Sequence, residues 1–73
     1  MKPGPIGEGQ GVVLDYDDAA GMGTVRAQDG AEYFFHCTSI ADGSRTIAEG
    51  TRVSFAITAG RQGIWEAVAV AAS

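Results

Sequence analysis

The chain has 73 residues, 45% of them hydrophobic and 19% charged, which predicts a single globular domain with one small core. Eleven glycines against two prolines favour a loop-rich β architecture over a helical bundle. The net charge of −4 argues against a general polyanion binder, because Lys and Arg contacts to phosphate supply most non-specific affinity for nucleic acid. The lone Cys37 excludes an intrachain disulfide and a cysteine-pair zinc site, and we find no secretory or membrane-length apolar run, so we expect a cytoplasmic protein that does not bind membranes.

The N-terminal part of the sequence predicts a tail followed by two strands. Residues 1–10 contain both prolines and several glycines, so we expect a flexible tail there and a folded domain over residues 11–71. Residues 12–16 predict the first strand and residues 22–27 the second. The residues between them, Asp-Asp-Ala-Ala-Gly, are typical of a turn.

A hairpin is predicted over residues 21–40, with Asp29-Gly30 at its turn. Side chains alternate across a strand, so Phe34 and His36 share one face of the third strand while the neighbouring Tyr33 and Phe35 share the other. We assign Tyr33 and Phe35 to the core. An outward Phe beside a His offers a flat platform with a polar edge, which suits the stacking of unpaired bases.

The second half of the chain predicts a long connection and two more strands. Residues 37–50 are mostly polar, with Ile40 and Ile47 as apolar anchors and room for one short helical turn. Residues 52–58 alternate as a half-buried strand, and a glycine-containing turn at 60–63 leads to a last strand over 64–71 whose inner side periodicity does not decide. Five short strands with a long connection after the third predict an all-β, five-stranded antiparallel Greek-key barrel.

The motifs resemble the bacterial cold-shock domain. The resemblance rests on Gly-x-Gly at 21–23, Asp29-Gly30, the Phe-x-His-x-x-x-Ile run at 34–40, and residues 47–55, which look like the family's Leu-x-Glu-Gly-x-x-Val-x-Phe signature. It covers about residues 11 to 70 and implies an OB-fold. It also implies that Ala67 and Val70 are both buried, which requires a bulge or bend between them.

The resemblance implies a nucleic-acid-binding face, which this sequence keeps only in part. Asp15 stands where the family has a Trp, Met22 and Thr24 replace two aromatics, and Cys37 and Ser44 replace two more. A stacked base is worth roughly 1–3 kcal/mol, so five missing rings could remove more than about 5 kcal/mol. We therefore expect weak binding of single-stranded RNA or DNA with little sequence preference. The residues expected to bind are Tyr16, Met22, Phe34, His36 and Arg45, with Arg26, Arg61 and Trp65 as additional candidates.

Simpler interpretations of these residues remain open. Met22 is also a plain gap-filler, His36 an ordinary exposed histidine, and Trp65 either a stacking platform or a packing residue. The acidic run of Asp15, Asp17 and Asp18 lacks the spacing of a calcium loop and is interpreted as a solvated turn. We find no catalytic constellation, metal site or cofactor motif, so we expect no enzyme activity.

Two hypotheses follow for the function. The first is a monomeric cold-shock-like protein that binds single strands. The second is a protein-interaction module on the same fold, in which exposed apolar residues beside an acidic rim meet a basic protein partner. Some members of the family are acidic overall and bind through a local face, so the net charge alone does not decide between the two.

Overall fold

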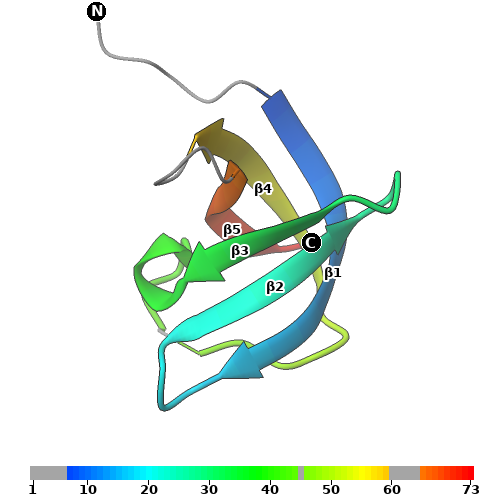
Figure 1. Ribbon diagram of the computed structural model, residues 1–73. Coiled ribbons are helices and arrows are strands. Elements are labelled where there is room, and N and C mark those ends of the chain that lie inside the picture. Colours follow the sequence, from blue (N-terminus) through cyan, green and yellow to red (C-terminus); the bar gives the residue numbers. More distant parts are fainter. Residues whose placement is uncertain (1–6, 45, 60–64) are drawn as a thin grey trace, which may run out of the picture.

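Five strands form a closed barrel in the computed structural model, which describes residues 7–44, 46–59 and 65–73 (Figure 1). Their order around the barrel is β1-β2-β3-β5-β4, and β1 closes the sheet by pairing with β4. All neighbours are antiparallel except β3 and β5, which meet in parallel through the pair Phe34 and Glu66. The predicted all-β Greek-key barrel is confirmed. The strands are β1 (Gly7–Asp17), β2 (Met22–Ala27), β3 (Glu32–His36), β4 (Arg52–Ala59) and β5 (Trp65–Ala72).

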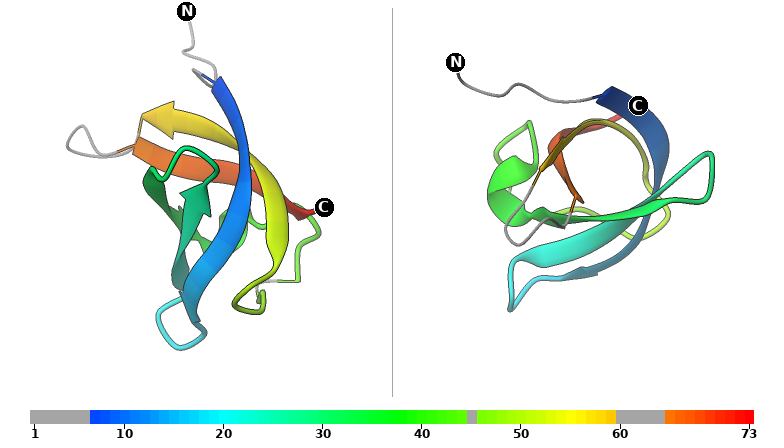
Figure 2. Two further views of the ribbon diagram at one scale, coloured as in Figure 1. Left: turned by 90° about the vertical axis from the view of Figure 1, so that its right-hand side faces the viewer. Right: turned by 45° about the horizontal axis from the view of Figure 1, so that its top comes forward.

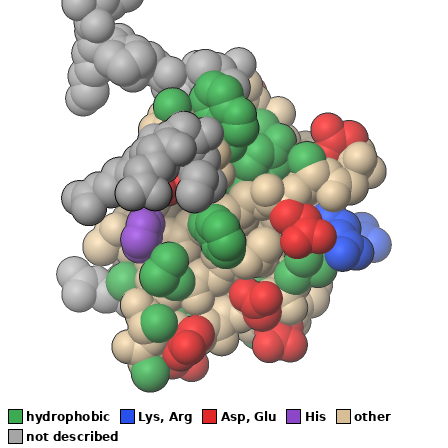
Figure 3. Space-filling model, in the orientation of Figure 1, with side chains coloured by type: hydrophobic (Ala, Val, Ile, Leu, Met, Phe, Trp, Pro, Cys, Tyr) green, Lys and Arg blue, Asp and Glu red, His purple; other side chains and the backbone are tan. Residues whose placement is uncertain are grey.

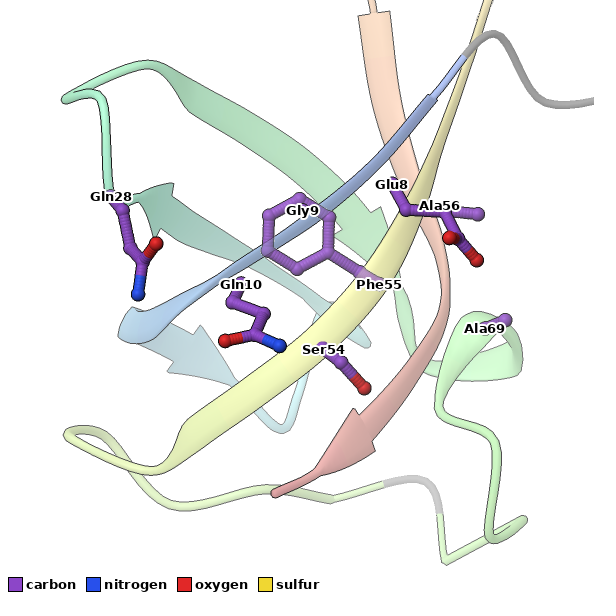
Figure 4. Close-up of a pocket in the computed structure, with 8 residues that line it drawn as sticks. All are labelled: Glu8, Gly9, Gln10, Gln28, Ser54, Phe55, Ala56 and Ala69. Atoms are coloured by element: carbon purple, nitrogen blue, oxygen red, sulfur yellow. The ribbon is translucent and has the colours of Figure 1, made fainter.

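The first strand is longer than the sequence predicts. Residues 7–10, expected in the flexible tail, are paired with β4, while residues 1–6 lie outside the described part. Gly9 explains the difference, since a Cβ there would lie 2.9 Å from Cε2 of Phe55. In Figure 4 the Phe55 ring overlaps the ribbon of β1 at Gly9. The glycine lets the strand cross closely over a core ring, so here it is a packing residue and not a sign of flexibility.

The turns follow the expected side-chain chemistry. The carboxylate Oδ1 of Asp17 accepts hydrogen bonds from the backbone N–H groups of Ala19 and Ala20, and Gly21 ends the turn with φ of 67°. Gly30 closes the β2–β3 hairpin with φ of 89°. The expected short helical turn is a 3-10 helix over Cys37–Ser39.

The core side chains fill the interior of the barrel. The right-hand view of Figure 2 looks into this barrel. Phe35 is completely buried, and Tyr33 packs against the core with its ring centroid 5.9 Å from that of Phe55, as the third-strand alternation predicts. The anchors Ile40 and Ile47 also pack in the core or against it. The buried residues are Val13, Val25, Phe35, Ile40, Val53, Phe55, Ala67 and Val70.

The bulge expected in the last strand is present. Val68 pairs with Ala56 and Ala71 with Ser54, so β5 has one more residue than β4 between these two pairs. Ala69 takes a positive φ of 51° within it and is exposed. Ala67 and Val70 can therefore both be fully buried although they are three positions apart.

Within the described ranges, the structure has no helix that is long and apolar enough to cross a membrane.

Candidate nucleic-acid interface

The outward side chains of β1, β2 and β3 form three cross-strand rows, which together we call the outer face. Each row takes one residue from each strand, as the paired residues show. Side chains of directly opposed residues lie next to one another on the same side of a sheet. The rows are the Phe34 row (Asp15, Thr24, Phe34), the His36 row (Asp17, Met22, His36) and the Glu32 row (Val12, Arg26, Glu32).

Three of the predicted site residues come together on the outer face. Met22 and His36 are direct cross-strand partners, and Phe34 occupies the adjacent row. Phe34 is 51% exposed and Met22 40%, so both present apolar surface to solvent beside the histidine. Figure 3 shows hydrophobic side chains and the histidine gathered over β2 and β3, with acidic side chains around them.

Tyr16, predicted as part of this face, lies on the inner side of the sheet. Its ring stacks on Phe35 with centroids 5.8 Å apart and planes 14° from parallel. Val13 pairs with Val25 and Asp15 with Thr24, so Leu14 is the extra residue of a bulge. The bulge turns Asp15 outward and Tyr16 inward, reversing the faces that strict alternation from Val13 would give.

Tyr16 therefore supports the outer face from beneath. Partial burial raises the pKa of its hydroxyl, and the nearby Cys37, Asp18 and Asp17 raise it further. The neutral phenol is the form that this environment favours.

The candidate arginines differ in their placement. Arg26 lies in the Glu32 row and donates from Nη2 to Oε2 of Glu32 at 3.2 Å, with both side chains about half exposed. That ion pair partly neutralises its charge. Arg45 and Arg61 lie outside the described residues.

Trp65 borders the outer face at the start of β5. It is 46% exposed and directly precedes Glu66, the partner of Phe34. The sequence did not reveal that Glu66 neighbours Phe34, because the contact joins strands that are distant in the chain and parallel. Glu66 extends the Phe34 row on the side away from Asp15.

The acidic residues of the first turn have different partners. Asp17 is engaged by the turn, and Oδ1 of Asp18 accepts a hydrogen bond from the Thr46 hydroxyl at 2.8 Å, which ties the turn to the long connection. Asp15 is exposed, and within the described ranges its side chain makes no hydrogen bond or ion pair. Its carboxylate is thus available to a ligand on the outer face.

Comparison with known proteins assigns the family. The model of the 'Cold-shock' DNA-binding domain matches residues 9–73. The chain belongs to the cold-shock domain family. It is 36% identical over 55 residues to the cold shock protein CapB of Pseudomonas syringae pv. tomato. The aligned residues cover 74% of this chain and 80% of the relative. It is also 36% identical over 63 residues to the cold shock-like protein CspG of Shewanella violacea, covering 84% and 90%.

A third relative, the major cold shock protein CspA of Pseudomonas aeruginosa, is 34% identical over 55 residues, or 74% of this chain and 80% of that protein. These similarities make the chain a nucleic-acid-binding protein of the cold-shock type and do not favour the protein-interaction hypothesis.

Three of the five positions at which the resemblance implies a lost family aromatic lie on one surface. Asp15, Thr24 and Met22, which stand where the resemblance places family aromatics, all belong to the two rows that contain Phe34 and His36. The outer face thus keeps its rings on β3 and lacks them on β1 and β2.

A separate pocket of about 440 Å³ opens beside Phe55, between the first half of β1, β4 and the β5 bulge (Figure 4). Glu8, Gln10, Gln28 and Ser54 supply its polar lining. Among the described site candidates, none lines this pocket, so it does not belong to the outer face.

Proposed function

We propose that this cold-shock protein binds single-stranded RNA or DNA on the outer face, with bases stacked on Phe34 and His36 and packed against Met22. The proposal rests on one observation, the 51% exposure of Phe34 beside His36 on an open sheet face of a nucleic-acid-binding fold. Every base has a π-face, so such stacking tolerates any sequence. Trp65 at the border of the face and the charges of Arg45 and Arg61 are included as further contacts.

The binding we propose is weak. Only β3 contributes rings to the Phe34 row and the His36 row, and each stacked base is worth roughly 1–3 kcal/mol. Asp15 and Asp17 lie on the same rows and repel phosphates within about 8 Å at physiological salt. We expect dissociation constants of about 10⁻⁴ to 10⁻⁶ M, the usual range for non-specific binding.

The proposal also describes a monomeric, non-enzymatic, cytoplasmic protein. Closure of the sheet into a barrel supports a monomer, because it removes the long free edges that pair with other chains. A chain with one cysteine lacks the disulfide framework typical of small secreted domains, which supports the cytoplasm.

The test is a titration of fluorescein-labelled single-stranded heptamers of thymidine and of uridine, followed by anisotropy at two salt concentrations. We expect saturable binding that weakens with salt. The slope should be shallow, since the chain has five Lys and Arg residues and each phosphate contact contributes only about 0.7 to the logarithmic slope. Absence of binding at several hundred micromolar protein would refute the proposal.

A further inference from the structure

Two adjacent rows of the outer face share one arrangement. Each has a ring on β3, a non-aromatic side chain on β2 and a carboxylate on β1. A base stacked on the ring can therefore extend over the β2 residue and present its edge to the carboxylate. The carboxylate is then a partner for the base and not only a source of repulsion for the phosphates.

The chemistry of the base edges decides which base such a site accepts. An ionised carboxylate only accepts hydrogen bonds, and its two oxygens form a pair. Guanine presents two adjacent donors, N1–H and the N2 amino group, on its Watson–Crick edge, and unpaired bases are commonly read on that edge. Thymine and uracil present one N–H between two carbonyl oxygens, which a carboxylate repels. Adenine and cytosine each present one amino donor beside a ring nitrogen that only accepts. A carboxylate at the end of a row thus favours guanine, which offers two adjacent donors.

The Phe34 row is better suited to this contact than the His36 row. The Asp17 carboxylate already accepts two backbone hydrogen bonds, whereas the Asp15 carboxylate has no hydrogen-bond partner within the described ranges. Two strand spacings, about 9–10 Å, separate the backbones of Phe34 and Asp15, and the short Thr24 side chain lies between them. A purine spans more of that distance than a pyrimidine does.

We propose that Asp15 makes the Phe34 row selective for guanine in a single strand, with the base stacked on Phe34, lying over Thr24 and donating from N1 and N2 to the Asp15 carboxylate. The inference rests on the proposed function, since it requires that bases bind on the outer face. It refines the expectation of little sequence preference to one selective position among tolerant ones.

The test compares three heptamers of thymidine: one unchanged, one with a central guanosine and one with a central inosine. The guanosine heptamer should bind roughly fivefold tighter than the unchanged one, the low end of what a bidentate base contact supplies. Inosine has the two-ring shape of guanosine but lacks the N2 amino group, so it should lose part of the gain. A single guanosine per strand avoids guanine self-association.

The variants Asp15→Asn and Glu66→Gln form a matched pair. Each removes one carboxylate from the same row, on opposite sides of Phe34. Loss of charge near phosphates changes affinity for all heptamers alike, so the ratio of guanosine to thymidine affinity isolates base recognition. Asparagine offers one acceptor and one donor, so Asp15→Asn should bring the ratio to near one, and Glu66→Gln should leave it unchanged.

The outcomes separate this inference from the proposed function. If the wild-type protein binds all three heptamers but with equal affinity, or if Asp15→Asn keeps the guanosine ratio, the selectivity of Asp15 is refuted while single-strand binding stands. Loss of the ratio in Glu66→Gln and not in Asp15→Asn also refutes it. If the wild-type protein binds none of the heptamers, the proposed function and the inference both fall.

Discussion

The neighbours Phe34 and Phe35 provide the most direct test of how β3 divides its roles. Phe35 is fully buried, its ring is stacked on Tyr16, and a Cβ on Gly23 would come within 2.7 Å of its Cζ, so the ring is tightly enclosed. Truncation of a buried Phe to Ala costs about 3–5 kcal/mol. A domain of this size has a free energy of unfolding of roughly 4–11 kcal/mol, at about 0.05–0.15 kcal/mol per residue. Phe35→Ala should therefore remove much of the stability.

Phe34→Ala should keep most of the stability and lose binding. The side chain is 51% exposed, so its loss removes about half of the roughly 1.5–3 kcal/mol that full burial of such a side chain provides, and the fold should survive. Loss of one stacked base should weaken heptamer binding roughly 5- to 150-fold. Phe34→Leu is the control, because it keeps an apolar side chain without the ring and should bind almost as weakly as Phe34→Ala.

Urea denaturation followed by circular dichroism measures the stability, and anisotropy titration of the thymidine heptamer measures the binding. If the two alanine variants lose similar stability, and binding falls only in proportion to the unfolded fraction, the assignment of the two faces of β3 is wrong. If Phe34→Leu binds like the wild type, the contact is hydrophobic and not stacking.

Three further predictions concern β1 and its neighbours. Asp15→Trp should raise affinity for a thymidine heptamer by roughly 1–3 kcal/mol, because it removes a repelling carboxylate and adds a stacking ring; a folded variant with no gain in anisotropy titrations would contradict this. Gly23→Ala should lower stability by about 1–3 kcal/mol, since its Cβ would meet the backbone oxygen of Asp15 at 2.6 Å. Gly7→Ala is the control, because a Cβ at Gly7 would have nothing within 4 Å, and this variant should unfold at the same urea concentration as the wild type. The raised pKa of Tyr16 stabilises the fold fully below pH 10, and this contribution is lost as the pH rises through the folded-state pKa. In urea denaturation, Tyr16→Phe should therefore lose less stability than the wild type between pH 8 and pH 11. Equal losses would refute the link between Tyr16 ionisation and the loss of stability.

The alternation of β3 was predictable from sequence because no irregularity interrupts it. Phe35 is buried and Phe34 exposed, as the period of two requires. The same rule fails in β1, where the bulge at Leu14 exchanges the faces of the residues that follow, and nothing in the composition around Leu14 marks it. The burial of Ala67 and Val70 was predictable only through the family resemblance.

Other features depended on contacts between distant parts of the chain. Glycine-rich residues before Gly11 look flexible in sequence, yet Gly9 is needed where β1 crosses Phe55, and only the register of β1 against β4 reveals this. The position of Glu66 beside Phe34 likewise follows from the order of strands around the barrel. Local patterns define the strands, whereas the composition of the Phe34 row depends on how they are paired.

The charge distribution decides what kind of recognition this face can support. All nine Asp and Glu residues lie in the described ranges, where Arg26 and Arg52 are the only Lys or Arg residues and Arg26 is paired with Glu32. Phosphate contacts add affinity without regard to sequence, so a face poor in cations loses mainly that sequence-independent share. In the binding that we propose, most of the remaining affinity comes from the bases, through their faces on Phe34 and His36 and their edges toward Asp15. Asp15, in place of the family's Trp, therefore weakens overall binding and at the same time makes a larger share of the remaining affinity depend on which base is bound.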